Sequence, residues 1–122
     1  MIDFSKLKKS FRYAFLGLRY SIDENQNIKI HIIVATFVLI FGLFLGLTRY
    51  ELFTVSLLIV LVISAEMINS AIEEVVDLLV DQHSEHAKIA KDVGAGMVLL
   101  ISIFAVVVGF FVFIPHVLSL FW

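Results

Sequence analysis

Three long apolar stretches constrain this chain more than any other feature of its sequence. They run from about Ile30 to Leu47, from Leu52 to Ala65 and from Val93 to Ile114. A helix needs roughly 20 mainly apolar residues to span a membrane, and the first and third stretches meet that need directly. The second continues in a helical pattern past its acidic residues to Val80. We therefore predict an all-α membrane protein with spanning helices over residues 30–47, 51–80 and 93–120.

The composition agrees with a membrane location. Of the 122 residues, 61% are hydrophobic, and the mean hydropathy is +1.02. A soluble domain of this length could not enclose so much apolar side chain, whereas lipid can act as its solvent. The length indicates a single domain over residues 1–122. The chain has no cysteine, which excludes disulfides and cysteine-based sites, and its net charge of −2 gives no indication of a nucleic-acid partner.

The segment before the first apolar stretch, residues 1–28, has a different pattern. Its large apolar side chains recur at spacings of three and four, at Phe4, Leu7, Phe11, Phe15, Leu18 and Ile22. Lys6, Lys9 and Arg12 occupy other faces. This periodicity predicts an amphipathic helix that lies in the membrane interface. The alternative is a helix that packs on another part of the protein.

The basic residues predict the orientation of the chain in the membrane. Six of them precede the first apolar stretch: Lys6, Lys8, Lys9, Arg12, Arg19 and Lys29. Lys88 and Lys91 belong to a predicted polar loop over residues 82–90 or to its end, whereas Arg49 lies in a predicted tight turn over residues 48–51. Since basic residues favour the cytoplasmic side, we expect the N-terminus and the second loop to be cytoplasmic. Pro115 is expected to kink or end the last helix.

A stripe of polar residues interrupts the second apolar helix. Glu66, Asn69, Glu73 and Asp77 are spaced by three, four and four, so they share one helical face. A carboxylate at the edge of hydrocarbon costs about 2.5–3.5 kcal/mol on insertion scales, which makes a functional role the first hypothesis. Like charges on one stripe repel unless a cation lies between them, and divalent cations prefer carboxylate oxygens. The alternative is a polar seam that holds helices together in an oligomer.

A second polar cluster, His86 to Asp92, precedes the last apolar stretch. Lys91 can bring an ammonium close to phosphate oxygens, and the free backbone N–H groups at a helix start favour anions. The alternative is a basic anchor at the interface. Carboxylates for a metal and a basic helix start together suggest phosphoryl transfer. Because the chain has neither a G-x-x-x-x-G-K-[ST] nor a G-x-G-x-x-G motif, such chemistry requires a different architecture.

The polar motifs resemble those of the bacterial family of small membrane diacylglycerol kinases and undecaprenol kinases. The resemblance rests on Glu66-x-x-Asn69-Ser70-Ala71-Ile72-Glu73-x-x-Val76-Asp77, Ala87-Lys88-x-Ala90-Lys91-Asp92, Gly94-Ala95, Gly17-Leu18-Arg19 and Asn27-x-Lys29-x-His31. It covers nearly the whole chain. It implies a homotrimer in the bacterial cytoplasmic membrane that transfers the γ-phosphate of ATP to a lipid hydroxyl on the cytoplasmic side.

The resemblance also implies roles for individual residues. Glu66 would be the general base, and Glu73 would bind Mg²⁺. Lys91 and Asp92 would contact the nucleotide, and Asn69 and Asp77 would shape the site. The remaining residues that would lie near ATP are Tyr13, Gln82, His83 and Ser84.

One position departs from the family pattern. The family has a glutamate six residues before the position of His31, where this chain has Asn25, and the glutamate stands one residue earlier, at Glu24. One residue is about 100° of rotation on a helix. Either the segment is distorted so that Glu24 reaches the metal, or Asn25 binds it weakly through its carbonyl oxygen.

The kinases of this family phosphorylate two different lipids, so undecaprenol and diacylglycerol are both candidate acceptors. The Asn27-x-Lys29-x-His31 pattern and the loop with His86 and Lys88 favour undecaprenol, and diacylglycerol is the alternative. A hypothesis of another class is a non-enzymatic membrane assembly protein whose acidic seam only specifies oligomerisation.

Overall fold

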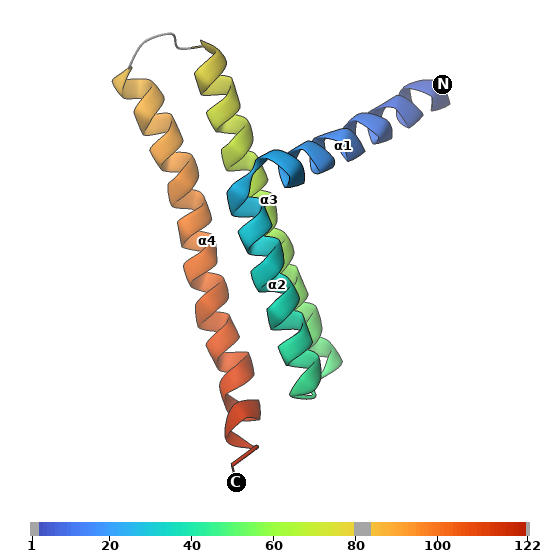
Figure 1. Cartoon of the computed structure of the whole chain (residues 1–122), viewed down its shortest axis with the longest axis vertical. Helices are drawn as coiled ribbons and strands as arrows, with labels where there is room; N and C mark the ends of the chain where they lie inside the picture. The colour runs from blue at the N-terminus through green and yellow to red at the C-terminus, as the bar shows by residue number, and fades with distance from the viewer. Residues whose placement is uncertain (1–2, 80–83, 122) are drawn as a thin grey trace.

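The computed structural model describes residues 3–79 and 84–121, and every regular element in these ranges is a helix. The helices are α1 (Phe4–Glu24), α2 (Gln26–Phe44), α3 (Arg49–Leu79) and α4 (Glu85–Leu118). In Figure 1, α2, α3 and α4 run alongside one another, and α1 projects away from them. The described part of the chain is therefore all-helical, and α2, α3 and α4 are long and apolar enough to cross a membrane.

Helix α3 lies at the centre of the packing and contacts both α2 and α4. Its buried residues Val55, Leu58, Val62 and Ala65 recur at spacings of three and four, which forms the inner face of an amphipathic helix. Most large apolar side chains on the outer faces of α2 and α4 are exposed in the single chain. Such surfaces are stable in contact with lipid or with other membrane helices.

Asn25 separates α1 from α2. Its backbone is extended, with φ −94° and ψ 115°, and its N–H group still donates to the carbonyl oxygen of Ser21 at 3.2 Å. Its side-chain Oδ1 accepts from the backbone N–H groups of Asn27 (2.8 Å) and Ile28 (3.2 Å). Asn25 is thus the N-cap of α2. A single non-helical residue between two helices produces the sharp change of direction seen in Figure 1.

The turn between α2 and α3 lies earlier than predicted. Gly46 has φ +73°, its N–H donates to Leu43, and the N–H of Leu47 donates to Gly42 at 3.0 Å, which is the Schellman pattern at a helix end. Helix α3 then begins at Arg49, so the predicted turn over residues 48–51 was wrong for its last three residues. The sequence Thr48-x-x-Glu51 is a capping box, and such a box begins a helix.

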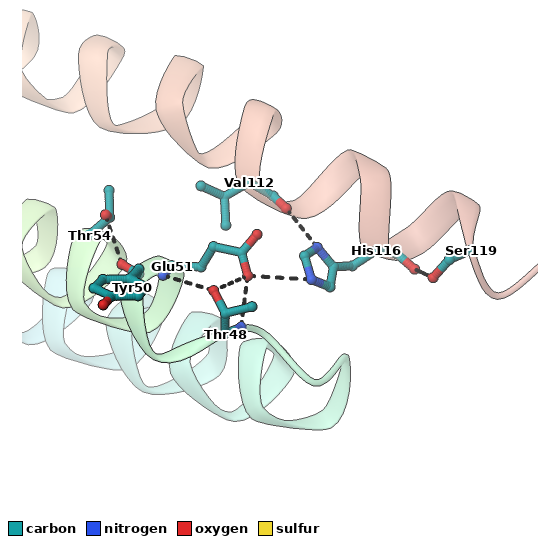
Figure 2. A network of polar contacts seen from close by, with 7 residues as sticks. All are labelled: Thr48, Tyr50, Glu51, Thr54, Val112, His116 and Ser119. Atoms are coloured by element: carbon teal, nitrogen blue, oxygen red, sulfur yellow. Dashed lines mark hydrogen bonds and ion pairs between the residues drawn. The ribbon is translucent and has the colours of Figure 1, made fainter.

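Figure 2 shows the polar contacts around this capping box. Glu51 Oε2 accepts from the backbone N–H and the hydroxyl of Thr48, both at 2.7 Å, and Thr48 Oγ1 accepts from the N–H of Glu51 at 3.3 Å. His116 Nε2 lies 3.5 Å from the same Glu51 oxygen, and its Nδ1 lies 3.0 Å from the carbonyl oxygen of Val112. These contacts connect the first turn of α3 to the last turns of α4.

Helix α4 is longer than predicted at its N-terminal end. It begins at Glu85, with Ser84 as its N-cap, so residues 85–90 of the predicted loop are helical. Ala87, Lys88 and Ala90 are good helix formers, and this propensity outweighed the polarity on which the loop prediction depended. The helix also continues through Pro115 and ends at Leu118, so Pro115 does not end it directly.

Candidate active site

Glu66 and Asn69 are the buried polar side chains among the described residues, with 3% and 4% of their surface exposed. Both lie on the inner face of α3. Glu66 Oε1 accepts a hydrogen bond of 2.9 Å from Asn27 Nδ2, which lies 39 positions earlier on the first turn of α2. Burying a carboxylate is costly unless it is hydrogen-bonded, and the Asn27 amide supplies that bond while leaving the second oxygen for other partners.

One turn beyond Glu66, Asn69 contacts the next carboxylate. Its Nδ2 donates to Glu73 Oε1 at 3.0 Å. The predicted stripe of Glu66, Asn69, Glu73 and Asp77 therefore includes a direct contact along one helix face, at the four-residue spacing that places side chains side by side.

Asp77 and Lys91 connect α3 to α4 at the end of the stripe. Asp77 Oδ1 lies 2.5 Å from Lys91 Nζ. Both side chains are substantially exposed, Asp77 at 66% and Lys91 at 36%. An exposed ion pair contributes little stability, about 0–1 kcal/mol, so the Lys91 ammonium can exchange this partner for another anion.

A cleft of about 520 Å³ lies between α1, the α1–α2 junction and α3. Four carboxylates line it, namely Glu24, Glu73, Glu74 and Asp77. The other lining residues are Gly17, Tyr20, Ser21, Asn25, Gln26, Asn27, Met67, Ser70 and Ala71. The structure therefore brings the two predicted metal ligands, Glu24 and Glu73, to one cleft, although they are far apart in the sequence.

The donor set of this cleft fits Mg²⁺. Within residues 3–79 and 84–121 no three acidic or histidine side chains are grouped closely enough to enclose a metal by themselves. Mg²⁺ usually binds one or two carboxylates and completes its coordination with waters and substrate phosphates, so it does not need such an enclosure. Glu24 and Glu73 match that requirement in number and in the chemistry of their oxygens.

Asn25 uses both ends of its side-chain amide within the protein. Its Oδ1 caps α2, and its Nδ2 donates to Ser70 Oγ on α3. The Ser70 hydroxyl donates in turn to the carbonyl oxygen of Glu66 at 2.8 Å. These bonds attach the start of α2 to α3 immediately beside the buried glutamate.

The other predicted nucleotide contacts are more dispersed. Tyr13 is 66% exposed on α1 and is not among the residues that line the cleft. Ser84 precedes α4 and Asp92 is exposed on its second turn. Gln82 and His83 lie outside the described residues.

The cleft also contains Tyr20, Asn27 and Glu74, which the sequence motifs did not predict as site residues. Tyr20 lines the cleft, and its hydroxyl lies 3.4 Å from Glu74 Oε1; the negative charge of Glu74 raises the pKa of Tyr20. A signal for Tyr20 was present, because Gly17, Tyr20 and Glu24 are spaced by three and four and so share one face of α1. The pairing of Asn27 with Glu66 depends on how two helices pack, and helix periodicity carries no signal for it.

A family model and several known proteins match most of this chain. A family model described as prokaryotic diacylglycerol kinase matches residues 12–113. The chain is 42% identical over 112 residues to a diacylglycerol kinase of Synechocystis sp., covering 91% of this chain but only 64% of that relative. It is 34% identical over 113 residues to the undecaprenol kinase of Bacillus subtilis, covering 93% and 92% of the two chains.

A diacylglycerol kinase of Haemophilus influenzae is more distant, at 29% identity over 94 residues, which cover 77% of this chain and 80% of that relative. The family model covers most of the chain, including α2, α3 and the carboxylate stripe. The chain therefore belongs to the prokaryotic diacylglycerol kinase family of membrane lipid kinases.

Proposed function

We propose that this protein transfers the γ-phosphate of ATP to the hydroxyl group of a membrane lipid, and that undecaprenol is the acceptor. The observation that carries the proposal is a buried glutamate, Glu66, held by Asn27 beside a cleft lined with carboxylates. A lipid kinase requires a catalytic group that can reach the phosphates of ATP on one side and a lipid in the hydrocarbon region on the other. Family membership supports the same reaction class.

An apolar groove beside Glu66 supports a lipid acceptor. The groove has a volume of about 510 Å³ and lies between α2, α3 and α4. Val62 and Ile63, about one turn before Glu66, belong to its lining. A lipid chain in this groove would bring its hydroxyl to the end of the hydrocarbon region, where Glu66 is found. Its lining is almost entirely apolar and suits chains without polar groups.

In the proposed reaction the lipid hydroxyl oxygen attacks the γ-phosphorus. Its proton passes to Glu66, the bond between the γ-phosphorus and the bridging oxygen breaks, and ADP leaves. The second Glu66 oxygen, opposite the bond from Asn27, is available to accept that proton. Mg²⁺ bound to the phosphates would supply charge neutralisation. Lys91 and Asp92 on α4 would contact the nucleotide together with Tyr13 and Ser84, and the sequence predicts the same role for Gln82 and His83.

We assign the metal-binding carboxylates to Glu73 and Glu24. Asn25 is the alternative to Glu24, but its Oδ1 already accepts two backbone hydrogen bonds at the start of α2. Binding a metal through that oxygen would weaken the cap. Glu24 carries a charge and lines the cleft together with Glu73. The break in the helix at Asn25 supports the alternative in which a distorted segment brings Glu24 to the metal.

In the membrane, we propose that α1 lies in the cytoplasmic interface and that three copies of the chain assemble. The basic residues of α1 and of the start of α4 support this orientation, because both then lie on the cytoplasmic side. The many apolar side chains exposed on α4 support contacts with other helices as well as with lipid. The acidic cleft then faces cytoplasmic ATP.

The acceptor is tested with a panel of lipids and ATP labelled on the γ-phosphate. We expect undecaprenol to be phosphorylated more efficiently than diacylglycerol; the near full-length match to an undecaprenol kinase supports that order. The reverse order would assign diacylglycerol, the substrate named for the Synechocystis relative. No ATP turnover with any lipid would favour the assembly-protein hypothesis instead.

A further inference from the structure

Asn69 on α3 and Gly94 on α4 meet in a very close contact beside the carboxylate stripe. Both residues are buried. A Cβ atom placed on Gly94 would lie 2.5 Å from Asn69 Oδ1, a distance that real Cβ atoms essentially never show. The present position of the Asn69 side chain is therefore compatible only with glycine at residue 94.

The hydrogen bonds of Asn69 determine which way its amide points. Nδ2 donates to Glu73 Oε1, and an exchange of the two amide atoms would place Asn69 Oδ1 against that carboxylate oxygen. Oδ1 consequently faces Gly94, and it has no hydrogen-bond partner within the described ranges. The Cα–H group of a glycine is a weak donor that can partly satisfy such an oxygen.

We propose that Gly94 is a positioning residue. Because it has no side chain, it leaves room for the Asn69 amide in the orientation that donates to the Glu73 carboxylate and directs it. This inference rests on the proposed function, in which Glu73 binds the divalent cation. Groups that hydrogen-bond to a metal ligand fix its orientation, and their loss typically lowers metal affinity or activity about 10–100-fold.

The contact should affect the metal site more than the fold. In Gly94→Ala, the atom that must move is the end of the Asn69 side chain, which can rotate without any shift of the helices. That rotation would take Nδ2 away from Glu73. The other two contacts of a Cβ at this position, Asn69 Cγ at 3.5 Å and Ile72 Cδ1 at 3.6 Å, are ordinary van der Waals packing. Alanine also favours the helix over glycine, so thermal unfolding should remain close to that of the wild type.

Gly96→Ala provides a matched control. Gly96 lies on the same helix as Gly94, and a Cβ placed on it meets nothing within 4 Å. The measurement is the affinity for Mn²⁺, used as the probe, in the presence of a non-hydrolysable ATP analogue, read by electron paramagnetic resonance on the purified full chain. We expect Gly94→Ala to weaken binding about tenfold or more. Gly96→Ala should bind as the wild type does.

A double variant tests whether Gly94 acts through Asn69. Asn69→Ala removes the amide, so adding Gly94→Ala to it should cause no further loss of Mn²⁺ affinity. If the losses of the two single variants multiply, Gly94 acts by another route and the inference is wrong. If Gly94→Ala does not fold, the double variant must restore folding, since it removes the crowded atom; failure to do so would assign Gly94 to helix packing alone.

The wild-type protein separates this inference from the proposed function. A wild type that phosphorylates lipid, together with a Gly94→Ala variant indistinguishable from Gly96→Ala, overturns the inference alone. A wild type that neither binds Mn²⁺ with the nucleotide nor phosphorylates any lipid overturns the proposed function, and the positioning role with it.

Discussion

At the scale of single residues, the site depends on side chains whose hydrogen bonds leave little freedom. Glu66 is 3% exposed and bonded to Asn27, and Asn25 has both ends of its amide occupied. A buried polar group that is satisfied in this way is held in one geometry, because leaving it unpaired costs about 1–3 kcal/mol. Neighbouring residues can therefore have different roles, as we propose for Glu24 and Asn25.

Glu66→Gln tests the role of the buried glutamate. The substitution keeps the shape and the contact with Asn27 but removes the basicity, so turnover should fall about 10²–10⁴-fold, the usual contribution of a general base. Nucleotide binding and thermal unfolding should stay unchanged. The measurement is the rate of lipid phosphorylation, with Glu85→Gln, on the exposed first turn of α4, as the control. If Glu66→Gln keeps more than about a tenth of the rate, another group is the base.

Variants at Glu24 and Asn25 separate metal binding from helix capping. Glu24→Gln should weaken the apparent Mg²⁺ affinity about tenfold or more, since the loss of a ligand should exceed the loss of a group that only supports one. Asn25→Ala should instead lower stability by about 1 kcal/mol through the lost N-cap. Asn25→Asp keeps the cap acceptor but loses the Nδ2 donor to Ser70, so it should lose less stability than Asn25→Ala. Metal titration and thermal unfolding of all three variants decide the assignment; weaker Mg²⁺ binding by Asn25→Ala with normal binding by Glu24→Gln would reverse it.

At the scale of elements, the ends of the helices determine where the chain changes direction. The extended backbone at Asn25 sends α1 away from α2, and the Schellman turn at Gly46 returns the chain into α3 (Figure 1). The capping box of Thr48 and Glu51, with its contact to His116, then joins α3 to α4 at the end opposite the cleft (Figure 2).

Gly46→Ala tests the turn between α2 and α3. A Cβ at this position meets no atom within 4 Å. The substitution should therefore lower the free energy of unfolding only by the cost of an alanine in the left-handed conformation, about 1–2 kcal/mol. Gly109→Ala is the control, because a Cβ there also meets nothing within 4 Å but the backbone is helical. Thermal unfolding in detergent micelles should show a loss for the first variant and none for the second. Equal stability of the two would mean that Gly46 adopts another conformation.

At the scale of the whole molecule, a single chain leaves most of its apolar side chains uncovered. The 18-residue hydrophobic window of α4 has no buried residue, and the outer faces of α2 are similarly open. Lipid or other membrane helices must cover these surfaces. The polar cleft and the start of α4 lie towards one end of the bundle, and the capping box lies at the other, so the orientation in the membrane decides which side receives ATP.

Cysteine labelling tests that orientation, and the absence of native cysteine makes the experiment direct. A cysteine at Ser5 should resist a membrane-impermeant maleimide added to intact cells and react after the membrane is opened. A cysteine at Ser119, beyond the end of α4, should react from the outside. Labelling of the Ser5 position in intact cells would place α1 outside and contradict a cytoplasmic site.

The sequence alone determined the helical class, the three membrane-length helices and the polar stripe from Glu66 to Asp77, because periodicity and hydrophobicity are local properties. It also indicated the family, since short motifs on one helix keep their spacing. The tertiary structure decided the pairing of Asn27 with Glu66, the bond from Asn25 to Ser70, and the contact of Gly94 with Asn69. The physical reason is that periodicity determines the faces of one helix, whereas the distances between helices depend on how the caps direct the chain and how side chains pack.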